Sequence, residues 1–137
     1  MKYPRSPKES VGGIVYFGRI IDKIRLMAAG ELHPDLHANL GKGFDQRMVS
    51  FLGLEYEALA DRVRAGGDDA GILEWSFALG VRPTDEQIEV WNGFMITRGW
   101  RDDLAVTLSR RKQESGFSER DDILTMFDYI DADEGRL

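Results

Sequence analysis

The chain has 137 residues, a net charge of −6 at pH 7 and a sequence pI near 4.9. That length suits one domain, which can bury roughly two thirds of its unfolded surface. The acidic balance disfavours nonspecific nucleic-acid binding, which needs a basic face, and the absence of cysteine excludes disulfides and thiolate chemistry. No stretch approaches the roughly 20 apolar residues of a membrane span, and the start "MKYPRSPKES" lacks the apolar core of a secretory signal. We therefore expect a soluble, cytoplasmic protein that binds neither nucleic acid nor membrane.

Apolar residues recur at helical spacing through the first half of the chain. They predict helices over residues 15–29, 44–52 and 55–65, with a polar loop between the first two. A fourth helix is predicted in "DDAGILEWSFALG", between an N-cap at Asp68 or Asp69 and a stop at Gly80. Its nearly continuous apolarity predicts a central helix.

The second half shows helix starts more clearly. Thr84 and Gln87 form a capping-box pattern ahead of an apolar stripe that contains Trp91. Asp102 is expected to cap a sixth helix that runs to about Glu114, and Ser118 with Asp121 to start the last. No stretch has the period-2 alternation of a strand. The fold class predicted for residues 1–137 is therefore all-α, a single compact domain of about seven short-to-medium helices.

Several stretches resemble one bacterial family, the domain of unknown function number 5069. They are "PRSPKESVGG", "IDKIR", "FDQRMVSFLGL", "PTDEQIEVWN", "RGWRDD" and "DDILTMFDYIDADEGR", and they span nearly the whole chain in order. The resemblance implies a small helical fold. It implies no catalytic residue that can be transferred to this sequence.

Two loops contain residues that bind ligands in other settings. "HPDLH" places His33 and His37 four apart with Asp35 between them, a set that could supply zinc ligands. Because Pro34 is tolerated only in the first turn of a helix, we favour a plain polar loop and expect no metal and no cofactor. "LGKGFDQR" places Lys42 between two glycines just before a helix, where backbone N–H groups can bind an anion. Lys42 and Arg47 would then be its charge partners, although a flexible entry to the helix explains the glycines equally.

The three tryptophans differ in their surroundings. Trp75 and Trp91 lie on apolar stripes and are expected in the core. Trp100 lies in "TRGWRDD" between Arg98 and Arg101, so it is either an exposed functional surface or a loop anchor.

The ending "DYIDADEGRL" is rich in carboxylates, whereas residues 1–30 hold six Lys or Arg against two acids. A calcium loop of the EF-hand type is excluded, because Gly135 follows Asp131 too soon and the chain ends too early. Asp128 and Asp131 are predicted in the last turn of a helix, where the macrodipole disfavours carboxylates. We hypothesise that arginines compensate, with Arg5, Arg19, Arg25 and "TRGWR" as candidates. A solvated tail and a divalent-metal site are the alternatives.

No nucleophile–base pair is recognisable, so the catalytic residues are unknown and whether the protein is an enzyme stays uncertain. The first hypothesis is a small binding or protein-interaction module without chemistry of its own, with an unknown protein or small-molecule partner and an unknown oligomeric state. The alternative is an enzyme that acts on a small anionic substrate in an Arg/Asp-lined cleft, with Asp45 or Asp128 as general base. The candidate ligand- or partner-binding residues are Lys42, Asp45, Arg47, Arg98, Trp100, Arg101 and Asp128.

Overall fold

A computed structural model describes residues 1–137, and helices dominate it. Seven α-helices are present: α1 (Phe17–Ala28), α2 (Phe44–Leu52), α3 (Tyr56–Arg64), α4 (Asp69–Leu79), α5 (Asp85–Thr97), α6 (Ala105–Glu114) and α7 (Met126–Asp133). The chain adds a 3-10 helix, η1 (Pro34–Asn39), and a hairpin of β1 (Ser10–Val11) and β2 (Ile14–Val15). The predicted all-α class and the number of helices are confirmed. None of the helices is both long and apolar enough to cross a membrane.

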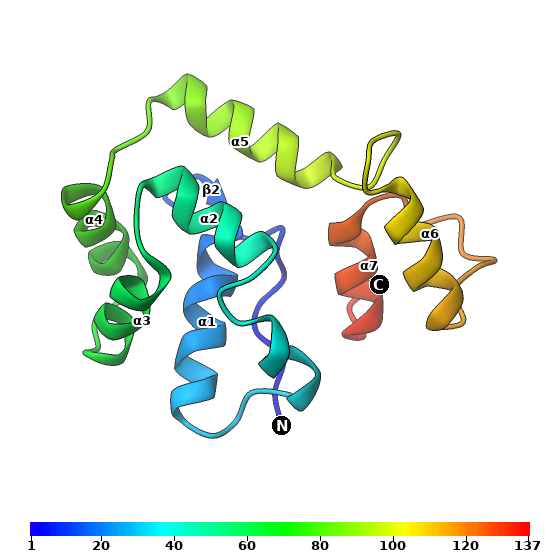
Figure 1. Ribbon diagram of the computed structural model, residues 1–137, viewed down its shortest axis with the longest axis horizontal. Coiled ribbons are helices and arrows are strands. Elements are labelled where there is room, and N and C mark those ends of the chain that lie inside the picture. Colours follow the sequence, from blue (N-terminus) through cyan, green and yellow to red (C-terminus); the bar gives the residue numbers. More distant parts are fainter.

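The helices form two groups joined by α5 (Figure 1). In that view α1 to α4 lie on one side, α6 and α7 lie on the other, and α5 runs across the top from one group to the other. The first nine residues pass beside α7, where Ser6 Oγ donates to Asp131 Oδ2 at 2.9 Å. The N-terminal segment therefore connects the two groups, in addition to α5.

Each group has its own apolar core. The larger core combines residues of α1, α2, α3, α4 and α5 with Phe127 of α7, and Phe127 is completely buried. The smaller core lies between α6 and α7 and includes Leu108 and Tyr129. Phe44 packs against both cores, and its ring meets that of Phe127 edge-on at 5.7 Å. The two groups thus meet through aromatic contacts at the start of α2.

The hairpin was not predicted, because two-residue strands are too short to show alternation. It ties α5 to the start of α1. Trp91 Nε1 donates to the carbonyl of Val15 at 3.2 Å, and Asn92 Oδ1 accepts from the Val15 N–H at 3.1 Å. The predicted capping box of Thr84 and Gln87 is present, and Trp91 is buried as expected.

Three details of the predicted helices are wrong. First, α4 is peripheral rather than central: Leu79 is exposed, and only Ile72, Leu73 and Ser76 of that helix are buried. A short apolar run covers the edge of the core here instead of passing through it. Second, Asp102 does not cap α6. Its carboxylate accepts from the N–H groups of Gly99 and Leu104, which closes the preceding turn.

The third correction concerns α7, which begins at Met126 and not near Ser118. Thr125 is its N-cap and accepts from the Asp128 N–H at 3.1 Å. Asp128 therefore lies in the first turn, where the macrodipole favours a carboxylate, and not in the last turn as predicted. Ile123 is buried from the loop before the helix.

Candidate functional site

A cleft of about 460 Å³ lies between the two groups of helices. One wall comes from α1 and from the segment that includes η1 and the start of α2, and the other comes from α6, α7 and Arg98. Volumes of roughly 300–1,000 Å³ are usual for small-molecule sites. The cleft is therefore large enough for a small ligand.

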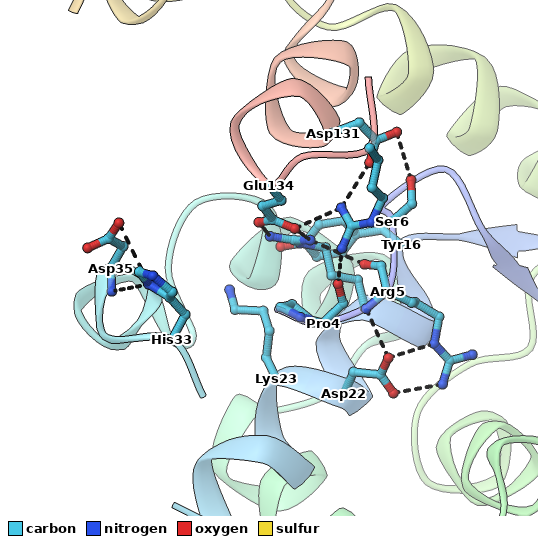
Figure 2. A network of polar contacts seen from close by, with 12 residues as sticks. Pro4, Arg5, Ser6, Tyr16, Asp22, Lys23, His33, Asp35, Asp131 and Glu134 are labelled. Carbon is cyan, nitrogen blue, oxygen red and sulfur yellow. Dashed lines mark hydrogen bonds and ion pairs between the residues drawn. The ribbon is translucent and has the colours of Figure 1, made fainter. Parts of the chain in front are cut away.

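The acidic C-terminus closes one side of this cleft by docking onto the start of the chain. Arg19 donates to both carboxylate oxygens of Glu134, at 2.8 and 2.5 Å, and both side chains are buried. Lys8 Nζ lies 2.7 Å from Asp128, and Arg136 donates to Asp131, Glu134 and the carbonyl of Pro4. Figure 2 shows Glu134 and Asp131 above Pro4 and Ser6. The docking hypothesis is confirmed, and the solvated tail is wrong.

The partners within the docking are only partly those expected. Arg19 is one of the proposed arginines, but Arg5 and Arg25 bind Asp69, and Arg5 also binds Asp22. Burial by itself would raise the pKa of the Asp128 carboxyl, but hydrogen bonds from Lys8 and from the Leu124 N–H outweigh it and lower the pKa.

The cleft concentrates positive charge in a protein whose net charge is negative. Six of its lining residues are basic (Arg19, Lys23, Lys42, Arg47, Arg98 and Arg111) and four are acidic (Asp35, Asp103, Asp133 and Glu134). Glu134 pairs with Arg19, and Asp103 pairs with Arg98. No ion pair engages Lys42, Arg47 or Arg111, so their charges are available to a ligand.

Two arginines of the cleft share one aromatic ring. The guanidinium carbons of Arg47 and Arg98 lie 5.3 and 4.9 Å from the centre of the Phe94 ring. Arg98 is buried, and its Nη1 donates to Asp102 and Asp103. Its Nε is the single buried side-chain nitrogen or oxygen of the protein without a hydrogen-bond partner. An unpaired buried donor of this kind costs about 1–3 kcal/mol, so a ligand acceptor near Arg98 would be favourable.

The start of α2 adds backbone donors to the same place. Gly43 and Phe44 both line the cleft, and neither of their N–H groups donates a hydrogen bond within the protein. The N-terminus of a helix favours anions through these N–H groups and the macrodipole. The anion site predicted in "LGKGFDQR" thus faces the cleft, together with Lys42 and Arg47.

A buried polar cluster of Tyr16, Lys23 and Asp45 lies at the base of the cleft. Asp45 accepts from Tyr16 Oη at 2.6 Å, from Lys23 Nζ at 2.9 and 3.0 Å, and from the Gly41 N–H at 2.9 Å. Asp45 is completely buried, and the Lys23 side chain is 4% exposed. Burial lowers the pKa of Lys23 despite the nearby Asp45, whereas burial and Asp45 raise the pKa of Tyr16 well above its usual value.

Acidic side chains from the two walls of the cleft repel one another. Burial, together with the charges of Glu134 and Asp35, raises the pKa of Asp133. Neither His33 nor His37 extends this set into a metal site. His33 Nδ1 accepts from the Asp35 N–H and His37 Nε2 contacts the Leu32 carbonyl, while no group of three His, Asp or Glu is placed to hold a metal ion.

The predicted site residues fall into three places. Lys42, Arg47 and Arg98 line the cleft, so the tertiary structure brings them together. Asp45 lies behind its base, with its oxygens engaged as described above. Trp100, Arg101 and Asp128 lie outside the cleft: Arg101 stacks on the exposed Trp100, and Asp128 pairs with Lys8.

Tyr16, Arg19 and Lys23 also line the cleft, but the sequence did not predict them as ligand-binding residues. They follow one another at i, i+3 and i+7, which places them on one face at the start of α1. The signal was available, because this face also contains the apolar Ile20. A charged residue at the edge of such a face is easily assigned to the solvent-exposed side of the helix. Only its burial in the folded protein shows that it belongs to the inner side.

A comparison with family models matches residues 1–136 to the domain of unknown function DUF5069. The chain belongs to this family. The match covers all elements described above, from the N-terminal segment to the docked C-terminus. A search of curated proteins gave no match.

Proposed function

We propose that this DUF5069 protein binds a small anionic molecule in the cleft between its two groups of helices. The observation that carries the proposal is Arg98, a buried arginine that lines the cleft and has an unpartnered Nε. Arg47 lies beside the same Phe94 ring without an ion pair, and the start of α2 contributes free N–H groups. Carboxylates and phosphates match these donors.

Of the two functions considered from the sequence, the geometry favours a binding module with a small-molecule ligand. A protein partner usually binds to a broad surface patch with an apolar centre and not in a charged cleft. In the enzyme alternative as first framed, neither proposed base reaches a substrate directly, because Asp45 lies behind the base of the cleft with its oxygens engaged and Asp128 lies outside the cleft. A cytoplasmic location remains part of the proposal.

Arg47 and Arg101 provide a matched pair of variants. Both are exposed and unpaired arginines stacked on an aromatic ring, but only Arg47 lines the cleft. We expect inorganic phosphate or small carboxylates to raise the melting temperature at constant ionic strength, since a ligand of the native state stabilises it. Arg47→Gln should weaken this binding about tenfold or more, the effect of losing one charge-assisted hydrogen bond.

Arg101→Gln should leave the dissociation constant unchanged. The proposal is wrong if no phosphate or carboxylate shifts the melting temperature of the wild-type protein. It is equally wrong if Arg101→Gln weakens binding as much as Arg47→Gln.

A further inference from the structure

The amine of Lys23 lies in a setting that has no evident structural need for a charge. Its side chain and that of Asp45 are almost completely buried, and they form an ion pair at the base of the cleft. A buried pair of this kind is seldom more stabilising than apolar residues of similar volume, because both ions lose their hydration. Because burying the Lys23 charge costs free energy, we infer that the amine has a function.

A second feature beside Lys23 also costs free energy. Tyr16 has φ 75°, in the left-handed region that residues other than glycine rarely adopt, and it is the N-cap of α1 without a side-chain cap. Such strain costs on the order of 1–3 kcal/mol and is concentrated at functional sites. This conformation is accompanied by the 2.6 Å bond from Tyr16 Oη to Asp45, the carboxylate that also holds Lys23.

Lys23 belongs to the lining of the cleft, and its amine is held there by Asp45. Figure 2 shows its side chain extending from α1 away from Asp22 and toward Glu134 and the loop that holds His33 and Asp35. Lys23, Asp35 and Glu134 all line the same cleft as Arg47 and Arg98. A ligand whose anionic group binds the arginines therefore shares one cavity with the amine.

We propose that Lys23 forms a covalent imine with a small anionic carbonyl compound, such as a 2-oxo acid or a phosphorylated aldehyde. This inference rests on the proposed anion binding and names the class of ligand. Burial provides the reactive form, because a desolvated lysine is more easily deprotonated than one in water.

The reaction balances within the cluster. Lys23 gives a proton to Asp45, and the neutral nitrogen attacks the carbonyl carbon to form a C–N bond. The carbonyl oxygen takes up protons that Asp45 relays from the nitrogen, and it leaves as water when the C–O bond breaks. The ammonium hydrogens end as one on the iminium nitrogen and two in the water. The iminium then carries the positive charge next to Asp45, so the charge of the buried pair is preserved.

Reductive trapping tests the proposal on the intact protein. Pyruvate and glycolaldehyde phosphate are each added with sodium cyanoborohydride, and the modified lysine is located by peptide mass spectrometry. Lactate, which has a carboxylate but no ketone, is the control for pyruvate. The chain has only five lysines (Lys2, Lys8, Lys23, Lys42 and Lys112), so the assignment is unambiguous. We expect the adduct chiefly on Lys23, with the exposed Lys42 of the same cleft as the internal comparison.

Arg47→Gln should slow trapping at Lys23 about tenfold, and excess phosphate should compete with it. Lys23→Arg keeps the charge opposite Asp45 and should remove that adduct. The mapping of the wild-type protein decides the matter even if this variant does not fold. Adducts confined to the other four lysines overturn the imine, as does a Lys23 adduct that neither Arg47→Gln nor phosphate affects.

The two proposals can fail separately. If anions stabilise the wild-type protein and Arg47→Gln weakens them, but Lys23 stays unmodified, the cleft binds anions without condensation. If anions have no effect on melting, the proposed function itself is wrong, whatever reacts with the carbonyl compounds.

Discussion

Arg19 and Glu134 lie 115 positions apart and form a two-point ion pair whose side chains are only 4% and 3% exposed. The pair joins the first helix to the residue that follows the last one. It therefore holds the acidic end of the chain against the wall of the cleft. Because the pair is shielded from water, its removal should affect both the stability and the shape of the site.

The two members of this pair should contribute to stability as a coupled unit. Arg19→Met leaves the buried Glu134 with only the more exposed Arg136 as a partner, and we expect a loss of roughly 3–5 kcal/mol in the free energy of unfolding. The double variant Arg19→Met/Glu134→Leu should lose clearly less than the sum of the two single variants. Denaturant unfolding measures all three. Arg64→Ala, which breaks an exposed contact with Asp61, is the control and should cost less than about 1 kcal/mol. Additive single losses would show that the two side chains are not coupled.

Deletion of residues 131–137 tests the whole docked end. The deletion removes Asp131, Glu134 and Arg136, and we expect a lower melting temperature in low salt. Added salt should reduce the difference without abolishing it, because the lost Lys8–Asp131 contact is partly exposed and screened, whereas Arg19–Glu134 is not. Deletion of Leu137 alone is the control. A truncated protein that melts like the full chain would contradict docking.

Trp91 and Trp100 should differ sharply in their effect on stability. Trp91 is 7% exposed, stacks on Phe51 at 4.6 Å and binds the carbonyl of Val15, so Trp91→Ala should cost on the order of 3–5 kcal/mol. Trp100 is 51% exposed, and its substitution by alanine should cost far less. Thermal and denaturant unfolding compare the two variants. Similar losses would show that the turn around Trp100 anchors the fold.

Protonation of Asp69 should contribute to the unfolding of the protein in acid. The hydrogen bond from Arg5 has the largest effect on the pKa of the Asp69 carboxyl and lowers it. Burial raises this pKa, but the hydrogen bond from Arg25 also lowers it, so the pKa of Asp69 is lowered in the folded state. The unfolded value is about 3.9, so between the two values the unfolded chain binds more protons. The stabilisation is present above pH 4 and is lost as the pH falls through the folded pKa.

Asp69→Asn should therefore lower stability at neutral pH and flatten the fall of stability below pH 4. Denaturant unfolding at a series of pH values measures this slope. Asp61→Asn, which changes an exposed carboxylate on α3, should leave the slope nearly as in the wild type. An unchanged slope in Asp69→Asn would mean that other carboxylates control acid unfolding.

The sequence by itself determined most of the helical fold. Local signals such as the capping box at Thr84 and the glycine that follows Leu52 are contained within a few residues, and α2 begins and ends at the predicted positions. Gly53 ends α2 with φ 71°, a conformation that glycine adopts without strain. The sequence also indicated a polar attraction between the two ends of the chain, because the opposite charges are visible in its composition. Two of the seven helix starts, those of α6 and α7, were misplaced, since Asp and Ser form turns as readily as caps.

Only the tertiary structure decided which of these polar residues form a site. Arg47 and Arg98 lie far apart in the chain and come from the ends of different helices, yet both line one cleft and both stack on the Phe94 ring. Lys23 looks like an ordinary surface residue in the sequence, and Asp45 was predicted only as a ligand-binding residue or general base, yet both are buried and pair with each other. Whether a charge is buried depends on contacts between segments far apart in the chain, as in Arg19 with Glu134. No local sequence pattern shows which distant segments will meet.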